Sequence, residues 1–417
     1  MTVRLGINGF GRIGRSAFRS SLERTDVDIV AINHTCDDAA YLIHALTYDT
    51  THGTSKYAGC MDILDDADEQ GRRKQYLVVY SPSSGAERTV LAKALLFSQR
   101  DATKLDWSAA RVDIVLECTG KLKTKEAASA HLAPKPTTVA ASTGSASTAV
   151  TSLSTPMPPP PPSPPRYVII SAPSSDARTF VYGVNHGDFD ADADRIVSNA
   201  SCTTNALAPL VHMLERLYGV DQGMMSTVHA STASQKVLDG FSSKRTDWRS
   251  GRCASANIIP TSTGAAKALS KVLPWTEGRL HGISIRVPVC NVSMIDLTVQ
   301  LSRPCPSKEE MMRNLDRLAA SDPALATVFA STDLALVSSD FIGRQESCIA
   351  DADASCRLGD NWYKIIAWYD NETGYATRLL DLARHMDLKS KAAAAVVPVA
   401  CQVALPPSAV SLTAAAI

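Results

Sequence analysis

Hydrophobic and polar residues are arranged along the first half of the chain in short apolar runs separated by polar segments. Continuous runs of this length are typical of strands that are buried on both faces. They cover Val3–Ile7, Val27–Ile32, Val112–Leu116, Tyr167–Ile170 and Thr179–Tyr182. Ala17, Phe18 and Leu22 show helical spacing between the first two runs. Buried strands that alternate with a helix predict a parallel sheet and an α/β fold class.

The pattern changes from about Asn199, where apolar and polar residues mix over longer segments. Strand candidates in this part are Gly282–Val292, Met294–Leu301 and Trp362–Trp368. The stretch from Gly374 to Leu388 has helical spacing and is expected to pack back on the first part. The pattern predicts a first domain over 1–200, an α+β domain over 201–372 and a C-terminal helix over 373–391.

Two segments lack the pattern of folded structure. Residues 134–166 are almost entirely Ala, Ser, Thr and Pro, with five consecutive prolines at Pro158–Pro162, which favour an extended, solvated chain. We expect a disordered, proline-rich surface insert, and a retained intron that is absent from the mature protein is the alternative hypothesis. Residues 392–417 are small, apolar and uncharged, and are expected to form a disordered tail.

Composition excludes several classes of protein. The 417 residues contain 42 Lys+Arg and 42 Asp+Glu, with 45% hydrophobic and 20% charged residues, which is typical of a globular chain of about two domains. Without a basic excess, no nucleic-acid partner is predicted. The longest apolar run, Ala392–Cys401, is too short for a membrane span, and the start has no secretory pattern, so the expected location is cytoplasmic. The ten cysteines form no C-x-x-C pair, and no metal site is predicted.

A glycine-rich turn follows the first predicted strand. Gly9, Gly11 and Gly14 have the spacing G-x-G-x-x-G and precede the predicted helix. These glycines permit a tight turn, close approach of the backbone to a pyrophosphate, and close packing of helix on strand, while the helix N-terminus offers free N–H groups. A strand, this turn, a helix and a second strand together predict a dinucleotide site.

The second strand ends in Asn33-His34-Thr35, where dinucleotide sites normally carry an acidic residue that binds the ribose hydroxyls. His34 cannot accept two hydroxyl hydrogen bonds as a carboxylate does, but it would not repel a 2′-phosphate. The alternative is a loop histidine without a role. The pattern therefore leaves the choice between NAD and NADP open.

A single thiol, Cys202, lies in the polar segment Ser198–Asn205, directly before the apolar segment Ala206–Val211. If Cys202 starts that helix, the helix dipole and free N–H groups would lower its pKa to roughly 3.5–7.5, which suits a nucleophile. The alternative is an inert, buried cysteine at a helix start.

Four strings, taken together, resemble the phosphorylating glyceraldehyde-3-phosphate dehydrogenase family. They are NGFGRIGR at the start, ISAPS at Ile170–Ser174, SNASCTTN around the thiol, and WYDNETGY at Trp368–Tyr375. The similarity runs from about Val3 to Leu388 apart from the insert. It implies a Rossmann dinucleotide-binding domain, an α+β catalytic domain, NAD or NADP as cofactor, and a homotetramer that acts on a small-molecule substrate and inorganic phosphate.

The resemblance also implies a role for each residue in these motifs. Cys202 corresponds to the nucleophile and His229 to the general base. Thr232 and Arg286 match the site for the substrate's C3 phosphate, while Ser201, Thr203 and Thr263 with Gly264 match the inorganic-phosphate site. The implied cofactor-binding residues are Gly9, Phe10, Gly11, Arg12, Ile13, Gly14, Asn33, His34, Thr35, Arg100, Thr119, Gly120, Ser171 and Asn371, the last orienting the nicotinamide carboxamide.

The implied reaction runs through two covalent states. The Cys202 thiolate, stabilised by a neighbouring imidazolium, adds to the aldehyde to give a thiohemiacetal, and His229 removes the hydroxyl proton as hydride leaves. Inorganic phosphate then attacks the resulting thioester and releases its acyl group as 1,3-bisphosphoglycerate. The rival hypotheses are oxidation of erythrose 4-phosphate, in which water attacks the thioester, and a non-catalytic binding or regulatory protein of the same fold.

Three positions depart from the family's pattern. His34 replaces an acidic residue and Phe241 replaces a proline that helps to exclude a 2′-phosphate, so both favour tolerance of NADP, with Thr35 and Arg100 as candidate contacts. Ala206 stands where many members carry a second cysteine. The alanine at this position leads to the hypothesis of a specialised second copy of the enzyme that tolerates an electrophilic inhibitor or oxidant.

Overall fold

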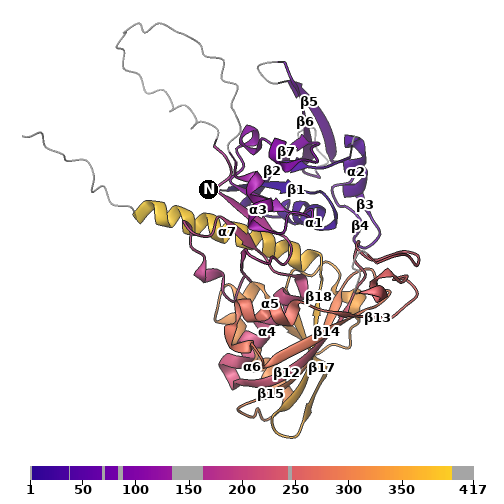
Figure 1. Ribbon diagram of the computed structural model, residues 1–417, viewed down its shortest axis with the longest axis vertical. Helices are drawn as coiled ribbons and strands as arrows, with labels where there is room; N and C mark the ends of the chain where they lie inside the picture. The colour runs from indigo at the N-terminus through magenta and orange to yellow at the C-terminus, as the bar shows by residue number, and fades with distance from the viewer. Residues whose placement is uncertain are drawn as a thin grey trace, which may run out of the picture.

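The computed structural model describes residues 2–36, 38–67, 71–82, 88–133, 163–242 and 247–396. The chain forms two halves, each built on one large sheet, and a long C-terminal helix lies along their boundary (Figure 1). The predicted α/β fold class, a Rossmann domain with an α+β domain, is confirmed.

The first half is built on a sheet of strand order β10-β11-β9-β8-β1-β2-β7-β6-β5. Neighbouring strands from β10 to β7 pair in parallel, and β6 and β5 extend the sheet as antiparallel strands. Their bounds are β1 Val3–Asn8, β2 Val27–Asn33, β5 Met61–Ala67, β6 Arg73–Tyr80, β7 Val90–Phe97, β8 Ile114–Glu117, β9 Tyr167–Ile170, β10 Arg178–Thr179 and β11 Ile196–Ser198; β3 Tyr48–Asp49 and β4 Gly53–Thr54 form a small separate pair.

The second half is built on a mixed sheet of strand order β13-β14-β12-β15-β18-β17-β16. Its strands are β12 Val220–His229, β13 Ile259–Ser262, β14 Leu280–Arg286, β15 Ser293–Leu301, β16 Phe329–Thr332, β17 Cys348–Leu358 and β18 Trp362–Tyr369. Side chains in β15 alternate between buried and partly exposed positions, as expected for a sheet with one face on the core. Helices α4 Cys202–Tyr218, α5 Ala265–Val272 and α6 Lys308–Ala320 cover that buried face.

Three shorter helices and the long C-terminal one complete the first half. They are α1 Arg12–Ser21, α2 Ala39–Thr47, α3 Lys125–Ala128 and α7 Thr373–Val396. Helix α7 packs on α1 and contributes Leu379, Leu380 and Met386 to the core of the dinucleotide-binding half. It is drawn in yellow between the two halves in Figure 1. It also runs to Val396, so the expectation of a disordered tail was wrong for residues 392–396, where consecutive alanines extend the helix.

Three predicted strands differ from the structure. The strand predicted at Thr179–Tyr182 is reduced to Arg178–Thr179, and the one predicted at Gly282–Val292 ends at Arg286, before Pro288. The strand predicted at Val112–Leu116 begins only at Ile114. Apolar runs continue into these loops because the loops are themselves buried, as Phe180, Val181 and Val292 are.

The insert was expected to be disordered up to Arg166, and that residue is instead held in the fold. The Arg166 N–H donates to the carbonyl of Asp113, and its guanidinium lies 2.6 Å from the Asp387 carboxylate on α7. The remaining expectations for the insert and the tail concern residues 134–162 and 397–417, which lie outside the described residues.

Candidate active site

The candidate nucleophile lies at the start of a buried helix. Cys202 is the first residue of α4, and Ser201 is its N-cap, with Oγ accepting from the Thr204 N–H at 3.0 Å. Ala200, just before the cap, has a positive φ of 57°, which is unfavourable for a residue with a Cβ. The Tyr375 hydroxyl of α7 donates to the Ala200 carbonyl at 3.1 Å and helps to hold this turn.

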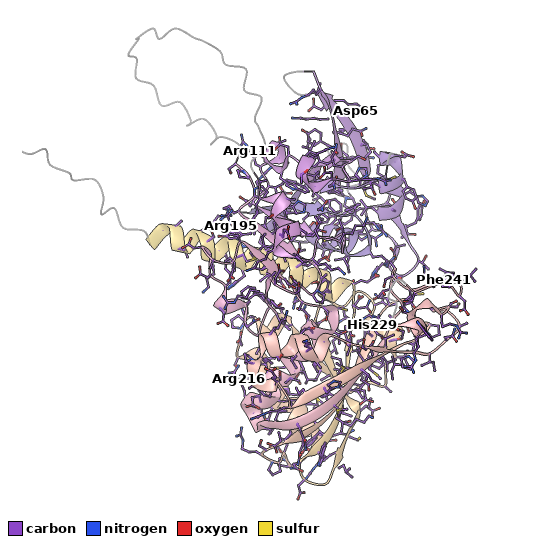
Figure 2. The ribbon with its side chains drawn as sticks, in the orientation of Figure 1. Asp65, Arg111, Arg195, Arg216, His229 and Phe241 are labelled. Carbon is purple, nitrogen blue, oxygen red and sulfur yellow. The ribbon has the colours of Figure 1, made fainter. Side chains whose placement is uncertain are left out.

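Strand register brings the other two reactive side chains to the same place. His229 ends β12 and Arg286 ends β14, and the two residues are paired in this parallel ladder. The Cys202 Sγ lies 3.4 Å from His229 Nε2, while Arg286 Nη1 lies 2.6 Å from His229 Nδ1. The structure thus brings the thiol, the imidazole and the guanidinium into one cluster (His229 is labelled in Figure 2).

Burial acts on both partners of the expected thiolate–imidazolium pair. Burial raises the pKa of the Cys202 thiol, and the charge of Arg286 and the Thr203 N–H only partly oppose this effect. Burial, together with the nearby guanidinium, lowers the pKa of His229 to about 4. Desolvation thus opposes the expected lowering of the thiol pKa by the helix N-terminus.

Besides Arg286, most of the residues expected at the two phosphate sites carry hydroxyl groups, and they lie on different segments. Thr203 is buried and its hydroxyl lies 2.9 Å from that of Tyr369. Thr232 follows β12 and contacts the Ser234 hydroxyl at 3.2 Å. Thr263 and Gly264 lie between β13 and α5. The strand pairing places this turn beyond Ile283 of β14, away from the end of β14 that carries Arg286. Thr263 Oγ1 accepts a hydrogen bond from the Ala265 N–H.

A cavity of about 600 Å³ opens beside the glycine turn of the first half. Its lining includes many of the residues expected to bind the cofactor: Gly9, Phe10, Gly11, Asn33, His34, Thr35, Arg100 and Thr119. Gly9 has a φ of +97°, and a Cβ there would lie 2.8 Å from the Thr119 N atom. A Cβ on Gly14 would lie 2.2 Å from the Gly9 carbonyl oxygen. Only glycine fits at both positions, which keeps the first turn of α1 open toward the cavity, as binding of a pyrophosphate requires.

Other expected cofactor residues lie outside this cavity lining. The Arg12 guanidinium pairs with the carboxylates of Glu372 and Asp49, so its side chain is directed to other protein groups and only its backbone N–H remains at the helix start. Ile13 packs on the core and Gly120 has a positive φ of 67° directly after Thr119. Ser171 contacts Cys118, and Asn371 Oδ1 accepts from the Ser293 hydroxyl at 2.7 Å.

Several residues that support the site were missed by the sequence analysis. The Tyr369 hydroxyl joins Thr203 and Thr227, and the Ser293 hydroxyl joins Asn371 to the Ala230 N–H. Tyr369 lies inside the WYDNETGY motif, so the motif itself could have indicated it. Ser293 carries no such signal, because only its pairing with Tyr369 in adjacent strands places it here.

A buried carboxylate contacts two residues that line the cavity beside the glycine turn. Glu117 accepts from Asn8 Nδ2 at 2.5 Å and from the Thr119 N–H at 2.9 Å, and lies 3.0 Å from His131 Nε2. The Trp107 indole N–H donates to the other nitrogen of His131. This network ties β1 to the loop after β8, and so holds Thr119 at the cavity wall.

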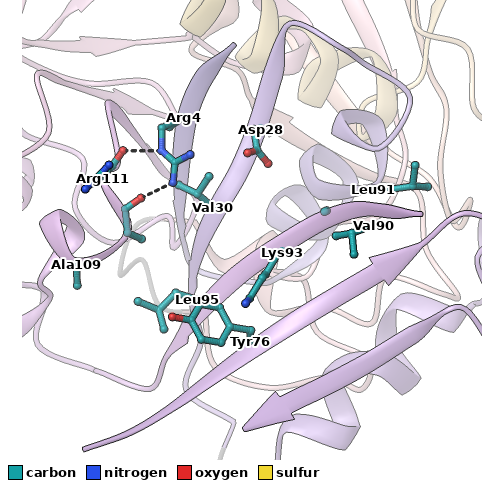
Figure 3. A pocket seen from close by; sticks show the side chains of 12 residues that line it. Arg4, Asp28, Val30, Tyr76, Val90, Leu91, Lys93, Leu95, Ala109 and Arg111 are labelled. Atoms are coloured by element: carbon teal, nitrogen blue, oxygen red, sulfur yellow. Dashed lines mark hydrogen bonds between the residues drawn. The ribbon is translucent and has the colours of Figure 1, made fainter. Parts of the chain in front are cut away.

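A second cavity, of about 550 Å³, lies on the same sheet but contains neither the glycine turn nor the thiol. Figure 3 shows Arg4, Asp28, Tyr76 and Lys93 around it, with Arg4 donating to the carbonyls of Ala110 and Arg111. Within the described ranges, no cluster of three or more His, Cys, Asp or Glu has the spacing to hold a metal ion. Among the described helices, none is long and apolar enough to cross a membrane.

Comparisons with known proteins agree with this geometry. A family model described as glyceraldehyde 3-phosphate dehydrogenase, NAD binding domain, matches residues 3–65, and one described as the C-terminal domain of the same enzyme matches residues 201–371. The chain belongs to the glyceraldehyde-3-phosphate dehydrogenase family. The predicted family is thereby confirmed, and with it a nicotinamide-dinucleotide oxidoreductase.

Curated members of the family resemble the chain over most of its length. A cytosolic glyceraldehyde-3-phosphate dehydrogenase of Chlamydomonas reinhardtii is 41% identical over 93% of this chain and 98% of its own. A chloroplastic one of Arabidopsis thaliana is 41% identical over 93% of this chain and 78% of its own. Glyceraldehyde-3-phosphate dehydrogenase 1 of Caenorhabditis elegans is 40% identical over 91% of this chain and 96% of its own. Both the dinucleotide half and the thiol half therefore belong to the region of similarity.

Proposed function

We propose that this protein oxidises glyceraldehyde 3-phosphate with NAD or NADP and inorganic phosphate to give 1,3-bisphosphoglycerate. The observation that carries the proposal is the 3.4 Å approach of the Cys202 Sγ to His229 Nε2 at the start of α4, beside the Arg286 guanidinium. A nucleophile, a base and an anion-binding group within one cluster are what acyl transfer from a phosphorylated aldehyde needs.

The residues divide the reaction between them. Cys202 forms a carbon–sulfur bond with the aldehyde, and His229 Nε2 accepts the proton of the resulting hydroxyl. Bound at the glycine turn, NAD or NADP supplies the hydride acceptor. Cys202 then holds the acyl group as a thioester until inorganic phosphate attacks it, and the hydroxyls of Ser201 and Thr203 beside the thiol provide donors for that phosphate.

The cavity supports use of NADP as well as NAD. His34 is buried at the cavity wall, where it accepts from the Cys36 N–H through Nδ1 at 3.2 Å, and Arg100 is also part of the lining. Neither group repels a 2′-phosphate, whereas a carboxylate would. Phe241 is 99% exposed at the periphery of the single chain (Figure 2), so His34 is the stronger argument for this cofactor preference.

We also propose a homotetramer in the cytoplasm. Five large apolar side chains are exposed between residues 237 and 242 and between 247 and 258, namely Val237, Leu238, Phe241, Trp248 and Ile258. Exposed apolar side chains in this number favour contact with another protein surface, and a second copy of the chain is the proposed partner. Sedimentation analysis checks the tetramer, and a strictly monomeric protein would contradict it.

The hypothesis of an inhibitor-tolerant second copy rests on Ala206. This residue is buried in α4 one turn after Cys202. Because alanine has no thiol, position 206 cannot form a disulfide with the nucleophile. Inactivation by iodoacetamide and by hydrogen peroxide, compared with the Ala206→Cys variant, tests the idea. Identical sensitivity of both proteins to both reagents contradicts it.

Absorbance of the reduced nicotinamide tests the reaction itself. Glyceraldehyde 3-phosphate is supplied with and without inorganic phosphate, using NAD and NADP in parallel, for the wild type and for Cys202→Ser. We expect phosphate-dependent turnover that Cys202→Ser abolishes. Turnover that does not need phosphate would favour the erythrose-4-phosphate type of reaction, and a folded protein without turnover would favour the binding role.

A further inference from the structure

The second cavity, of about 550 Å³, lies across strands β1, β2, β7 and β6 of the first sheet. Val30 in its lining belongs to the apolar cluster around Trp107, whereas α1 and α7 pack on the opposite face of the sheet. Within the described part of the chain, this cavity shares no lining residue with the cofactor cavity. Its volume is typical of a site for a small molecule.

Two cations border the second cavity without a carboxylate partner. In the part of the chain that the structure describes, neither Arg4 nor Lys93 forms an ion pair. The Arg4 guanidinium donates through Nε and Nη2 to the carbonyls of Arg111 and Ala110, at 3.1 and 3.0 Å, so it is held in place while Nη1 has no acceptor. The Lys93 ammonium lies 4.4 Å from the centre of the Tyr76 ring, a weak contact at an exposed site. Both cations are therefore available to an anion.

One carboxylate lines the same cavity. Asp28 is paired with Arg4 on the neighbouring strand, and Figure 3 shows Asp28, Arg4 and Lys93 around the cavity. The Asp28 side chain is half-buried, and among the described residues no group donates a hydrogen bond to it. Burial raises the pKa of Asp28, and the charge of Arg4 only partly opposes this effect. A carboxylate in this environment is stabilised by a ligand that brings hydrogen-bond donors.

The directions of these groups favour a phosphate over a carboxylate as the bound anion. A carboxylate is bound best by two parallel N–H groups of one guanidinium, and the Nε and Nη2 side of Arg4 already donates to carbonyls. Nη1 and a lysine ammonium are instead separate donors, which suit phosphate oxygens that face several directions. Asp28 would repel a bare phosphate but would accept hydrogen bonds from sugar hydroxyls, as acidic residues do at ribose.

We propose that the second cavity binds a sugar phosphate, with its phosphate on Arg4 and Lys93 and its hydroxyls on Asp28. Val30 and Leu95 provide the apolar surface for the sugar ring. Free sugar phosphates and nucleotides both carry this combination of groups, so both are sources of the ligand. The site is separate from the reactive thiol and from the cofactor cavity, and the proposal does not rest on the proposed function.

Fluorine NMR of the full-length protein labelled with 3-fluorotyrosine tests the proposal. Tyr76 lines the cavity and is a local reporter, and its signal is identified by its loss in Tyr76→Phe. Glucose 6-phosphate should shift this signal saturably, while glucose and inorganic phosphate should bind at least about tenfold more weakly. Adenosine 5′-monophosphate is titrated in parallel. Tighter binding than glucose 6-phosphate assigns the site to nucleotides, and weaker binding assigns it to free sugar phosphates.

Two substitutions separate the roles of the charged groups. Lys93→Gln should raise the Kd for glucose 6-phosphate at least about tenfold, whereas Lys104→Gln, which removes an exposed lysine outside the cavity lining, should leave it unchanged. Asp28→Asn should weaken glucose 6-phosphate and strengthen inorganic phosphate, because it removes both an acceptor and a repulsive charge.

Three results would overturn the proposal. They are a Tyr76 signal that does not shift saturably with either glucose 6-phosphate or adenosine 5′-monophosphate, equal Kd values for Lys93→Gln and the wild type, and inorganic phosphate that binds Asp28→Asn no more tightly than the wild type. The titration needs no turnover. A failure of the proposed function would therefore be seen in the assay of cofactor reduction and not in this one.

Discussion

The Arg12 guanidinium at the start of α1 forms an ion pair with the Glu372 carboxylate, which lies 360 residues later in the chain. Arg12 is part of the glycine turn, and Glu372 directly follows Asn371, the residue expected to hold the nicotinamide carboxamide. His52 Nε2 also lies 3.1 Å from Glu372. One carboxylate thus links the two ends of the proposed cofactor site across the boundary between the halves.

Replacing Glu372 should therefore weaken cofactor binding. In Glu372→Gln the hydrogen bonds to Arg12 lose their ionic character, which is worth about 1–2 kcal/mol and corresponds to roughly a tenfold higher Kd for the cofactor. Fluorescence titration measures Kd, and Glu23→Gln is the control because its carboxylate pairs with the exposed Lys56. Equal Kd values for both variants would show that the link has no part in cofactor binding.

Restoring a carboxylate at the end of β2 should change the cofactor preference. In His34→Asp the carboxylate would accept hydrogen bonds from the ribose hydroxyls and repel a 2′-phosphate. We expect kcat/KM for NADP to fall at least about tenfold relative to that for NAD, a change of about 1.4 kcal/mol in the difference between the two. Steady-state kinetics with both cofactors measure the ratio. A strict preference of the wild type for NAD would remove the premise.

Removing the Tyr369 hydroxyl should slow the reaction as well as destabilise the fold. Tyr369→Phe leaves the buried hydroxyls of Thr203 and Thr227 without this shared partner, which lies 2.9 and 2.7 Å away, at a cost of about 1–3 kcal/mol. We expect kcat to fall several-fold because Thr203 adjoins the thiol.

Tyr363→Phe is the matched control for this variant. Its hydroxyl, also on β18, donates to the Cys305 carbonyl at 2.7 Å, away from the thiol. This variant should lose a similar amount of stability, measured by urea unfolding, while kcat stays unchanged. Unchanged kcat in both variants would show that Tyr369 has only a structural role.

Stability should fall as the pH decreases from about 6.5 to 4. Burial lowers the pKa of His385 to about 4 and the pKa of His229 to about 4. Between about pH 4 and 6.5 the unfolded chain therefore binds protons at these two histidines that the folded chain does not bind. The buried His229 adds up to about 1.4 kcal/mol per pH unit to the slope, and the half-buried His385 adds less because solvent screens its charge. The stabilising effect of each histidine is complete above its ordinary pKa of 6.5.

The contribution of His385 can be isolated by substitution. The free energy of unfolding, measured by urea titration between pH 4.5 and 7.5, should depend less steeply on pH in His385→Asn than in the wild type. His281→Asn is the control because His281 is exposed on β14. Equal slopes in the wild type and His385→Asn would contradict the assignment.

Sequence patterns were most informative where function depends on neighbouring residues in the chain. The glycine turn, the start of α4 at Cys202 and the strand ending at Ile170 depend on local geometry, so their motifs identified the fold class and the family. The antiparallel strands β5 and β6 were not predicted from the pattern of hydrophobic and polar residues. They extend the edge of the parallel sheet because β6 pairs with β7 and β5 pairs with β6.

What the sequence determined by itself was the family, the two kinds of domain, and the identity of the candidate nucleophile and base, because these are encoded in short strings with a direct chemical meaning. The tertiary structure alone decided that Arg286 contacts His229, that Glu372 holds Arg12, and that burial raises the pKa of Cys202. These relationships come from strand register and from packing between distant segments. Register and desolvation are properties of the folded molecule, and no local pattern along the chain encodes them.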